Sequence, residues 1–131
     1  MTSQYAEVAE EVGDHQLLRL AGAWLEGSTP GVDALRAAIP EDPLLSPGSG
    51  PSGPEAMHRL NAVERAFRRR FGFSVPTPAM VDDLARSGSW VEVGAGTGFL
   101  ARLVANVGGD IVATDIVGSG ERTRYGAVSG V

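Results

Sequence analysis

The sequence predicts an α/β fold in which one strand–helix–strand unit follows a helical N-terminal region. Three observations predict it. Residues 90–115 contain two short β-rich runs on either side of an apolar helical stretch. A turn with three glycines joins the first run to that stretch. The first 39 residues show helical spacing of their apolar side chains. Because a strand–helix–strand connection needs a crossover, the two strands are predicted to be parallel.

Length and composition restrict the classes of protein. The 131 residues correspond to about one domain, and a hydrophobic fraction of 43% excludes a wholly disordered chain. The absence of cysteine excludes a disulfide scaffold, a thiolate zinc site and a cysteine nucleophile. All eleven basic residues are arginine, which excludes lysine chemistry. The net charge of −5 argues against a nucleic-acid partner.

The sequence shows no targeting or membrane segment. No run reaches the roughly 18 apolar residues that a membrane span needs. Residues 1–11 carry three glutamates and no basic residue, unlike a secretory leader. These features predict a cytoplasmic protein without a membrane partner.

The first 39 residues are interpreted as an N-terminal helical cap. Helical spacing runs over residues 3–27, with an apolar stripe of Leu17, Leu18, Ala21, Trp24 and Leu25. A glycine break predicts a second helix that is capped by Asp14 and ended by Gly27. Thr29, followed by a proline, predicts a third helix that extends to Ile39.

A linker and a long helix follow. Residues 40–54 are interpreted as the linker, because five prolines and three glycines leave no regular element. A helix is predicted over residues 54–70, with Glu64 and Arg68 as an i,i+4 pair and an apolar face of Met57, Leu60, Val63, Phe67 and Phe71. The triplet Arg68–Arg70 has two interpretations, a patch that binds an anion or a nucleic acid, or a solvated turn that complements the helix dipole. The dipole argument and the acidic net charge favour the second.

One more helix precedes the glycine-rich segment. Thr77, followed by a proline, predicts a helix that runs from Pro78 to Ser87. Asp82 and Arg86 are predicted to pair at i,i+4. Its inward face is predicted to consist of Met80, Val81, Leu84 and Ala85.

The strand–helix–strand unit carries the chemistry. Its elements are a strand at Trp90–Val93, a turn at Gly94–Gly98, a helix at Phe99–Val107 and a strand at Ile111–Thr114, with Asp115 at its end. The buried face of the helix is predicted to consist of Leu100, Leu103, Val104 and Val107.

The glycine turn has a physical reason. Glycine permits the dihedrals of a sharp strand-to-helix turn and lets a ligand approach the backbone. The helix N-terminus offers free N–H groups to an anion. Asp115 stands 21 residues after Gly94, where a carboxylate can accept both hydroxyls of a ribose. The segment therefore predicts a nucleotide-like ligand.

The order of acid and glycines points to one family. The dinucleotide fingerprint G-x-G-x-x-G would need a glycine where Phe99 stands, whereas residues 92–98 read E-x-G-x-G-x-G. The form VEVGAGTG resembles motif I of the class I S-adenosylmethionine-dependent methyltransferases. Asp115, in IVATDI, resembles that family's acidic residue at the end of strand two. The resemblance covers about residues 72–116, and FGFSVPTPAMVDDLARSG is similar to the lead-in helix of some bacterial members.

The resemblance implies a Rossmann-like methyltransferase fold with S-adenosylmethionine as cofactor. Residues 55–131 would then be lead-in helices and the start of the cofactor-binding domain. The family's glycines let the methionine part of the cofactor lie against the backbone. Glu92 would lie near its amino end, Asp115 would hold the ribose, and Ala95 and Thr97 would add backbone contacts. The cofactor-binding residues implied are Glu92, Gly94, Ala95, Gly96, Thr97, Gly98 and Asp115.

Other interpretations of single residues stay open. Glu92 could be a solvated strand carboxylate, although a charge between two valines needs a partner. Asp115 could cap the loop, and the glycines could form only a turn. No general base is identified, because His15 and His58 stand isolated on helices and Tyr125 is a weaker candidate. No metal site is predicted.

The family's fold has seven strands, and this sequence offers two clear ones. Only sixteen residues follow Asp115, and the tail from Gly126 could begin another strand. The family's adenine-contacting and catalytic segments are not recognisable. We therefore expect the N-terminal portion of a methyltransferase, truncated after strand two, with weak cofactor binding and no turnover. The front helices are expected to cover one sheet face only.

Three functions are considered. The first is a methyltransferase, or a fragment of one, that acts on an unknown acceptor, either a small molecule or a protein. The second is a fragment of an NAD(P)-type nucleotide-binding oxidoreductase with a variant loop. The third is a non-catalytic helical interaction protein that binds its partner through Leu17, Trp24 and Leu25.

Overall fold

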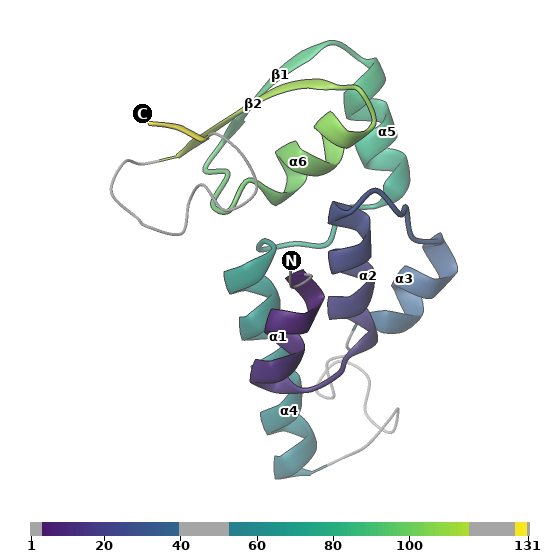
Figure 1. Ribbon diagram of the computed structural model, residues 1–131, viewed down its shortest axis with the longest axis vertical. Coiled ribbons are helices and arrows are strands. Elements are labelled where there is room, and N and C mark those ends of the chain that lie inside the picture. The colour runs from purple at the N-terminus through teal and green to yellow at the C-terminus, as the bar shows by residue number, and fades with distance from the viewer. Residues whose placement is uncertain (1–3, 40–52, 116–127, 131) are drawn as a thin grey trace.

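The computed structural model describes residues 4–39, 53–115 and 128–130 (Figure 1). Most of the predicted linker and Tyr125 lie outside these residues. The helices are α1 (Gln4–Val12), α2 (Gln16–Leu25), α3 (Val32–Ala38), α4 (Pro54–Arg70), α5 (Pro78–Arg86) and α6 (Phe99–Asn106). The strands are β1 (Ser89–Val93), β2 (Asp110–Asp115) and β3 (Val128–Gly130). The described chain is thus a small α/β structure, as predicted.

The sheet is parallel, with strand order β1-β2-β3. Ser89 lies opposite Asp110, and Val93 lies opposite Thr114. The strand–helix–strand prediction is therefore confirmed in its order and its strand direction. The tail supplies the further strand, because β3 pairs with the end of β2 from Ala113 onward.

One core joins the helical part to the sheet part. Figure 1 shows α1 to α4 in one half of the molecule and the sheet with α5 and α6 in the other. Trp24 of α2 and Phe67 of α4 meet Phe99 of α6 edge to face, with ring centroids 6.4 and 6.1 Å apart. The Asn106 side-chain amide also donates to the Leu25 carbonyl at 3.2 Å. Each buried aromatic pair of this kind stabilises the fold by about 0.5–1.5 kcal/mol beyond the contribution of its buried apolar area.

Helix ends follow the predicted signals, with two exceptions in the front. Gly27 follows α2 with a φ of +105°, and the Thr77 hydroxyl accepts from Met80 N at the start of α5, both as predicted. The cap of α2, however, is His15 and not Asp14. Its Nδ1 accepts from the Leu17 N–H at 3.1 Å, while Asp14 pairs with an arginine of the same helix. The third helix begins after Gly31 rather than at Thr29.

Burial explains the role of His15. Desolvation lowers its pKa, and the nearby Arg59 charge lowers it further, against the smaller opposing effect of Asp14. A neutral imidazole can leave Nδ1 as a hydrogen-bond acceptor, whereas an imidazolium cannot. The histidine is therefore structural.

Three side-chain predictions in the second half are wrong. Met80 was expected in the core but is 42% exposed, because it lies about 100° around the helix axis from the buried Val81. Val107 is also exposed, since α6 ends at Asn106 and leaves it beyond the last turn. Arg86 pairs with Asp83 at 3.5 Å and not with Asp82. The predicted pair on α4 is present, with Arg68 3.8 Å from Glu64.

One face of the sheet is covered and the other is open in the described chain. The covering helices are α5 and α6 rather than the front helices; α6 packs on β2, and the Trp90 indole donates to a carbonyl of α5. On the opposite face Val91, Val93 and Val112 are exposed. Parallel sheets normally have both faces covered.

The turn after α6 has no room for a side chain at Gly109. A Cβ there would lie 2.4 Å from Val104 Cγ1 and 2.8 Å from Ala85 Cα. We therefore expect Gly109→Ala to lower the free energy of unfolding by about 1–3 kcal/mol, as overpacking does. Thermal unfolding measures the loss, and a variant as stable as the wild type would contradict the close packing of α5 on α6.

Candidate functional site

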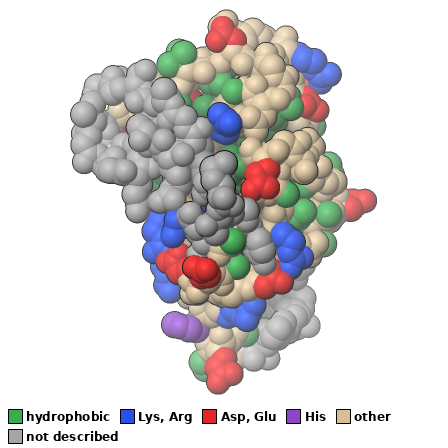
Figure 2. Space-filling view, viewed as in Figure 1, with side chains coloured by type: hydrophobic (Ala, Val, Ile, Leu, Met, Phe, Trp, Pro, Cys, Tyr) green, Lys and Arg blue, Asp and Glu red, His purple; other side chains and the backbone are tan. Residues whose placement is uncertain are grey.

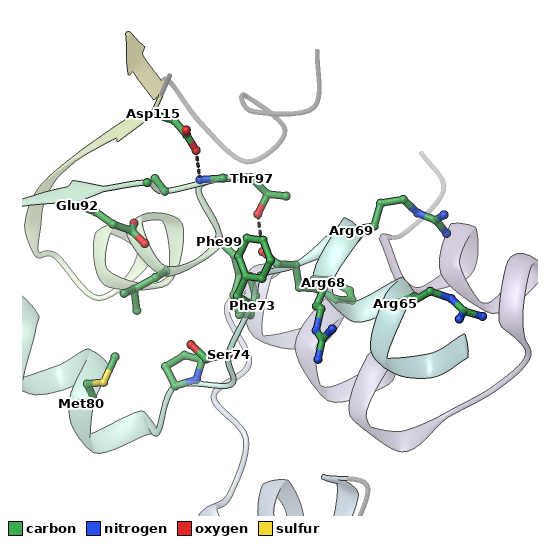
Figure 3. A pocket seen from close by; sticks show the side chains of 17 residues that line it. Arg65, Arg68, Arg69, Phe73, Ser74, Met80, Glu92, Thr97, Phe99 and Asp115 are labelled. Carbon is green, nitrogen blue, oxygen red and sulfur yellow. Dashed lines mark hydrogen bonds between the residues drawn. The ribbon is translucent and has the colours of Figure 1, made fainter. Parts of the chain in front are cut away.

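A cavity of about 760 Å³ lies between the glycine loop, residues 94–98, and the C-terminal end of α4. Figure 3 shows Glu92 and Asp115 on one side, the arginines of α4 on the other, and the rings of Phe73 and Phe99 between them. This volume falls within the range of about 300–1,000 Å³ that is typical of ligand pockets. Of the seven predicted binding residues, the cavity wall includes Glu92, Gly94, Ala95, Gly96, Thr97 and Asp115.

The loop needs glycine for its conformation. Gly94, Gly96 and Gly98 have φ values of +72°, +57° and +83°. Residues other than glycine rarely adopt this left-handed backbone conformation, which costs them roughly 1–2 kcal/mol each. A Cβ at Gly94 or Gly96 would meet no atom within 4 Å. The backbone at these two positions is therefore open to the cavity, as expected for a loop that lies against a ligand.

Most of the loop's N–H groups already have partners. The Ala95 N–H donates to the Thr114 carbonyl at 2.9 Å, and the Gly98 N–H donates to the Ala95 carbonyl at 3.0 Å. The Gly96 N–H donates to Asp115 Oδ2 at 2.6 Å. The Ala95 N–H is therefore already paired, and the predicted backbone contact of Ala95 with a ligand stays a prediction. Asp115 caps the loop, which was the alternative interpretation of this residue, and it still lines the cavity.

Thr97 attaches the loop to the helical part. Its side chain is 7% exposed, and its hydroxyl donates to the Phe71 carbonyl at the end of α4. The sequence predicted only a backbone role for this residue. The hydrogen bond spans 26 residues and fixes the two walls of the cavity relative to one another.

Thr97→Val tests this attachment. The isosteric valine removes this buried hydrogen bond, so we expect the free energy of unfolding to fall by about 1–3 kcal/mol. Chemical denaturation measures the loss. The same substitution at the exposed Thr29 serves as the control and should be nearly neutral. Equal effects of the two substitutions would contradict the role of the hydroxyl.

Glu92 carries an unusual carboxylate. Its Oε2 atom is buried and has no hydrogen-bond partner among the described residues. Burial raises the pKa of this carboxyl, and a hydrogen bond from the backbone of Ala101, in the first turn of α6, lowers it by less. A buried carboxylate oxygen without a partner is costly and calls for a cation. The interpretation of Glu92 as a solvated strand residue is therefore not supported by its burial.

The wall opposite the loop was not predicted. Arg65, Arg68 and Arg69 line the cavity from the last turns of α4. Arg69 and Arg70 also contact Glu11 of α1, so the triplet is more than a solvated turn at a helix end. The spacing i, i+3, i+4 places the three lining arginines on one face, and this spacing was the signal available in the sequence.

Two apolar side chains at the cavity were also missed. Phe73 is 84% exposed and Met80 is 42% exposed, and both line the cavity. A phenylalanine in a sequence of ordinary hydrophobicity is usually assigned to the core, so its exposure here could be found only from the structure.

Charges of both signs are spread over the described surface, as Figure 2 shows for one face. No group of three or more acidic or histidine side chains in the described parts of the chain could hold a metal ion. A helix that crosses a bilayer needs about 20 apolar residues, and the described helices include none of that length and character.

Comparison with known proteins gives no family. No protein-family model matches the chain, and no curated protein or solved structure is significantly similar to it. The function therefore has to be argued from the cavity itself.

Proposed function

We propose that the chain binds S-adenosylmethionine in this cavity and belongs to an S-adenosylmethionine-dependent methyltransferase with a Rossmann-like fold. The observation that carries the proposal is Glu92, whose buried Oε2 has no hydrogen-bond partner in the described parts of the chain and lies beside an open glycine backbone. A ligand with a cationic amino group would supply the missing partner. The ammonium group of the cofactor's methionine part has this character.

The order of the site supports the same ligand. Glu92, the glycine loop and Asp115 lie in turn around one end of the cavity. A carboxylate can accept several hydrogen bonds, so the bond from the Gly96 N–H leaves Asp115 able to accept from a ribose hydroxyl. The strand order β1-β2-β3, all parallel, agrees with the start of a doubly wound sheet.

The NAD(P) alternative is less well supported. The dinucleotide fingerprint places a glycine where helix and strand approach closely. Phe99 stands there and is 3% exposed, with its ring among Trp24, Phe67 and Phe71. The end of the cavity at the glycine loop also offers a carboxylate to a cation, whereas the pyrophosphate of a dinucleotide is an anion.

The third alternative, a helical interaction protein, is not supported by the burial of its proposed contact residues. Leu17, Trp24 and Leu25 are buried in the shared core and cannot contact a partner. No other observation favours this alternative.

The cofactor would supply a methyl group on a sulfonium. The acceptor nucleophile would bond to that methyl carbon in line with the C–S bond, which would break and release S-adenosylhomocysteine as a neutral thioether. The protein's part in such chemistry is alignment and exclusion of water. Glu92 would hold the amino group, the glycine loop would hold the methionine part, and the Phe73 and Phe99 rings would limit water between the two walls. The acceptor is a small molecule or a protein, and no described residue is assigned as a general base.

Calorimetric titration tests the proposal. We expect S-adenosylmethionine and S-adenosylhomocysteine to bind with similar affinity, and NAD to bind at least tenfold more weakly. Binding of NAD that equals or exceeds that of S-adenosylhomocysteine would favour the oxidoreductase alternative. No heat with any of the three ligands, confirmed by the absence of a thermal shift, would overturn the proposal.

A further inference from the structure

The cavity has a second end, which the cofactor proposal does not use. Arg65 and Arg68 line it from successive turns of α4, and in Figure 3 they lie on the side opposite Glu92 and Asp115. Residues three apart on a helix share a face, so the two guanidinium groups can reach one ligand.

Both guanidinium groups are available to an anion. Arg65 has no ion pair or hydrogen bond with any described residue. Arg68 contacts only Glu64 among these residues, at 3.8 Å and with both side chains well exposed. An exposed pair of this kind contributes about 0–1 kcal/mol and is readily exchanged for a better partner. Arg69, by contrast, is held by Glu11 of α1.

An apolar surface separates this end from the loop. Phe73, 84% exposed, lies in the cavity wall together with Phe99 (Figure 3). An exposed aromatic ring beside two arginines suits a molecule with one apolar or aromatic part and one anionic group. Arginine forms bidentate hydrogen bonds with both carboxylate and phosphate groups, so either anion fits.

From this geometry we infer that Arg65 and Arg68 form an anion subsite and that the methyl acceptor is a small molecule with a carboxylate or phosphate group. This inference rests on the proposed function, because it assigns the loop end of the cavity to the cofactor. A concave site suits a small molecule. The chain's net charge of −5 does not favour a nucleic acid.

The test uses three probes on the purified chain: benzoate, phenyl phosphate, and benzamide as the uncharged counterpart of benzoate. We expect benzoate or phenyl phosphate to bind about tenfold or more tightly than benzamide, and the stronger of the two identifies the anion. The double variant Arg65→Gln/Arg68→Gln should remove this preference. The control is Arg36→Gln, which removes one arginine charge from the exposed surface of α3 and should leave the anion preference unchanged.

S-Adenosylhomocysteine separates the two proposals. We expect its affinity to stay within about twofold in the double variant. A loss of S-adenosylhomocysteine affinity as large as the loss of probe affinity would show that the arginines bind the cofactor's own carboxylate. That result would overturn the subsite. Equal binding of benzoate and benzamide, or an anion preference that survives in the double variant, would also overturn it. Anion binding that depends on the arginines without any S-adenosylhomocysteine binding would overturn the proposed function and leave the anion site standing.

The single variant Arg65→Gln keeps the test valid should the double variant fail to fold. Arg65 is exposed and has no described partner, so its removal should leave the unfolding temperature unchanged while weakening the anion probe. Unchanged probe affinity in this stable variant would contradict the inference.

Discussion

Phe99→Ala is expected to lower the free energy of unfolding by about 3–5 kcal/mol, the cost of removing a buried phenylalanine. The ring is 3% exposed and packs against Trp24, Phe67 and Phe71, which come from α2, α4 and the residue after α4. Small domains have about 5–15 kcal/mol of stability in total. The variant should therefore unfold at a much lower temperature than the wild-type chain and be largely unfolded near 37 °C.

Phe73→Ala is the matched control. Phe73 lines the same cavity but is 84% exposed, so its loss should change the free energy of unfolding by no more than about 0.5 kcal/mol. Chemical denaturation of both variants measures the difference. Similar stabilities of the two variants would show that Phe99 does not join the helical part to the sheet part.

Glu92→Gln is expected to separate ligand affinity from stability. The substitution removes the negative charge that would face the ligand's ammonium group, so the affinity for S-adenosylhomocysteine should fall about tenfold or more. At the same time the protein should unfold at a higher temperature at neutral pH, because a neutral amide is cheaper to bury than a carboxylate. Calorimetric titration and thermal unfolding measure the two effects.

The pH dependence of the stability effect follows from the direction of the pKa shift. Burial holds the pKa of Glu92 above its ordinary value of 4.5 in the folded chain. The unfolded state therefore releases this proton first, and stability is lost as the pH rises through the folded-state pKa. The advantage of the glutamine variant should be full above that pKa and vanish below the ordinary value. An advantage that grows on acidification would contradict the burial of the charge.

Local signals in the sequence predicted much of the fold. Thr77 and the proline after it started a helix, Gly27 followed the end of one, and the glycine turn separated a strand from a helix. Each of these signals acts through the backbone within a few residues, so no tertiary information is needed to interpret it. The parallel direction of β1 and β2 was also predictable, because the crossover leaves no other simple arrangement.

The candidate site was predictable on one side only. Glu92 and Asp115 stand next to strand ends and a glycine loop, and this local context identified them. The opposite wall is formed by arginines about 25 residues earlier in the chain, and their approach to the loop depends on the Thr97 hydroxyl and the Phe99 ring. The arginine spacing is visible in the sequence, but the contacts that bring the two walls together join distant residues and leave no local pattern.

Single side chains were mistaken where two local signals competed. Asp14 is a good helix cap by type, but the neighbouring His15 occupies that position and Asp14 takes an arginine instead. Met80 is apolar and has helical spacing, yet the helix presents it to the cavity.

Hydrogen exchange tests the location of the cofactor most directly. Exchange is followed by mass spectrometry on the wild-type chain, alone and with saturating S-adenosylhomocysteine or NAD. We expect S-adenosylhomocysteine to slow exchange in peptides that cover residues 89–101 and 110–115, and NAD to leave them unchanged. Unchanged exchange at the glycine loop with S-adenosylhomocysteine, or equal protection with NAD, would contradict the proposed site.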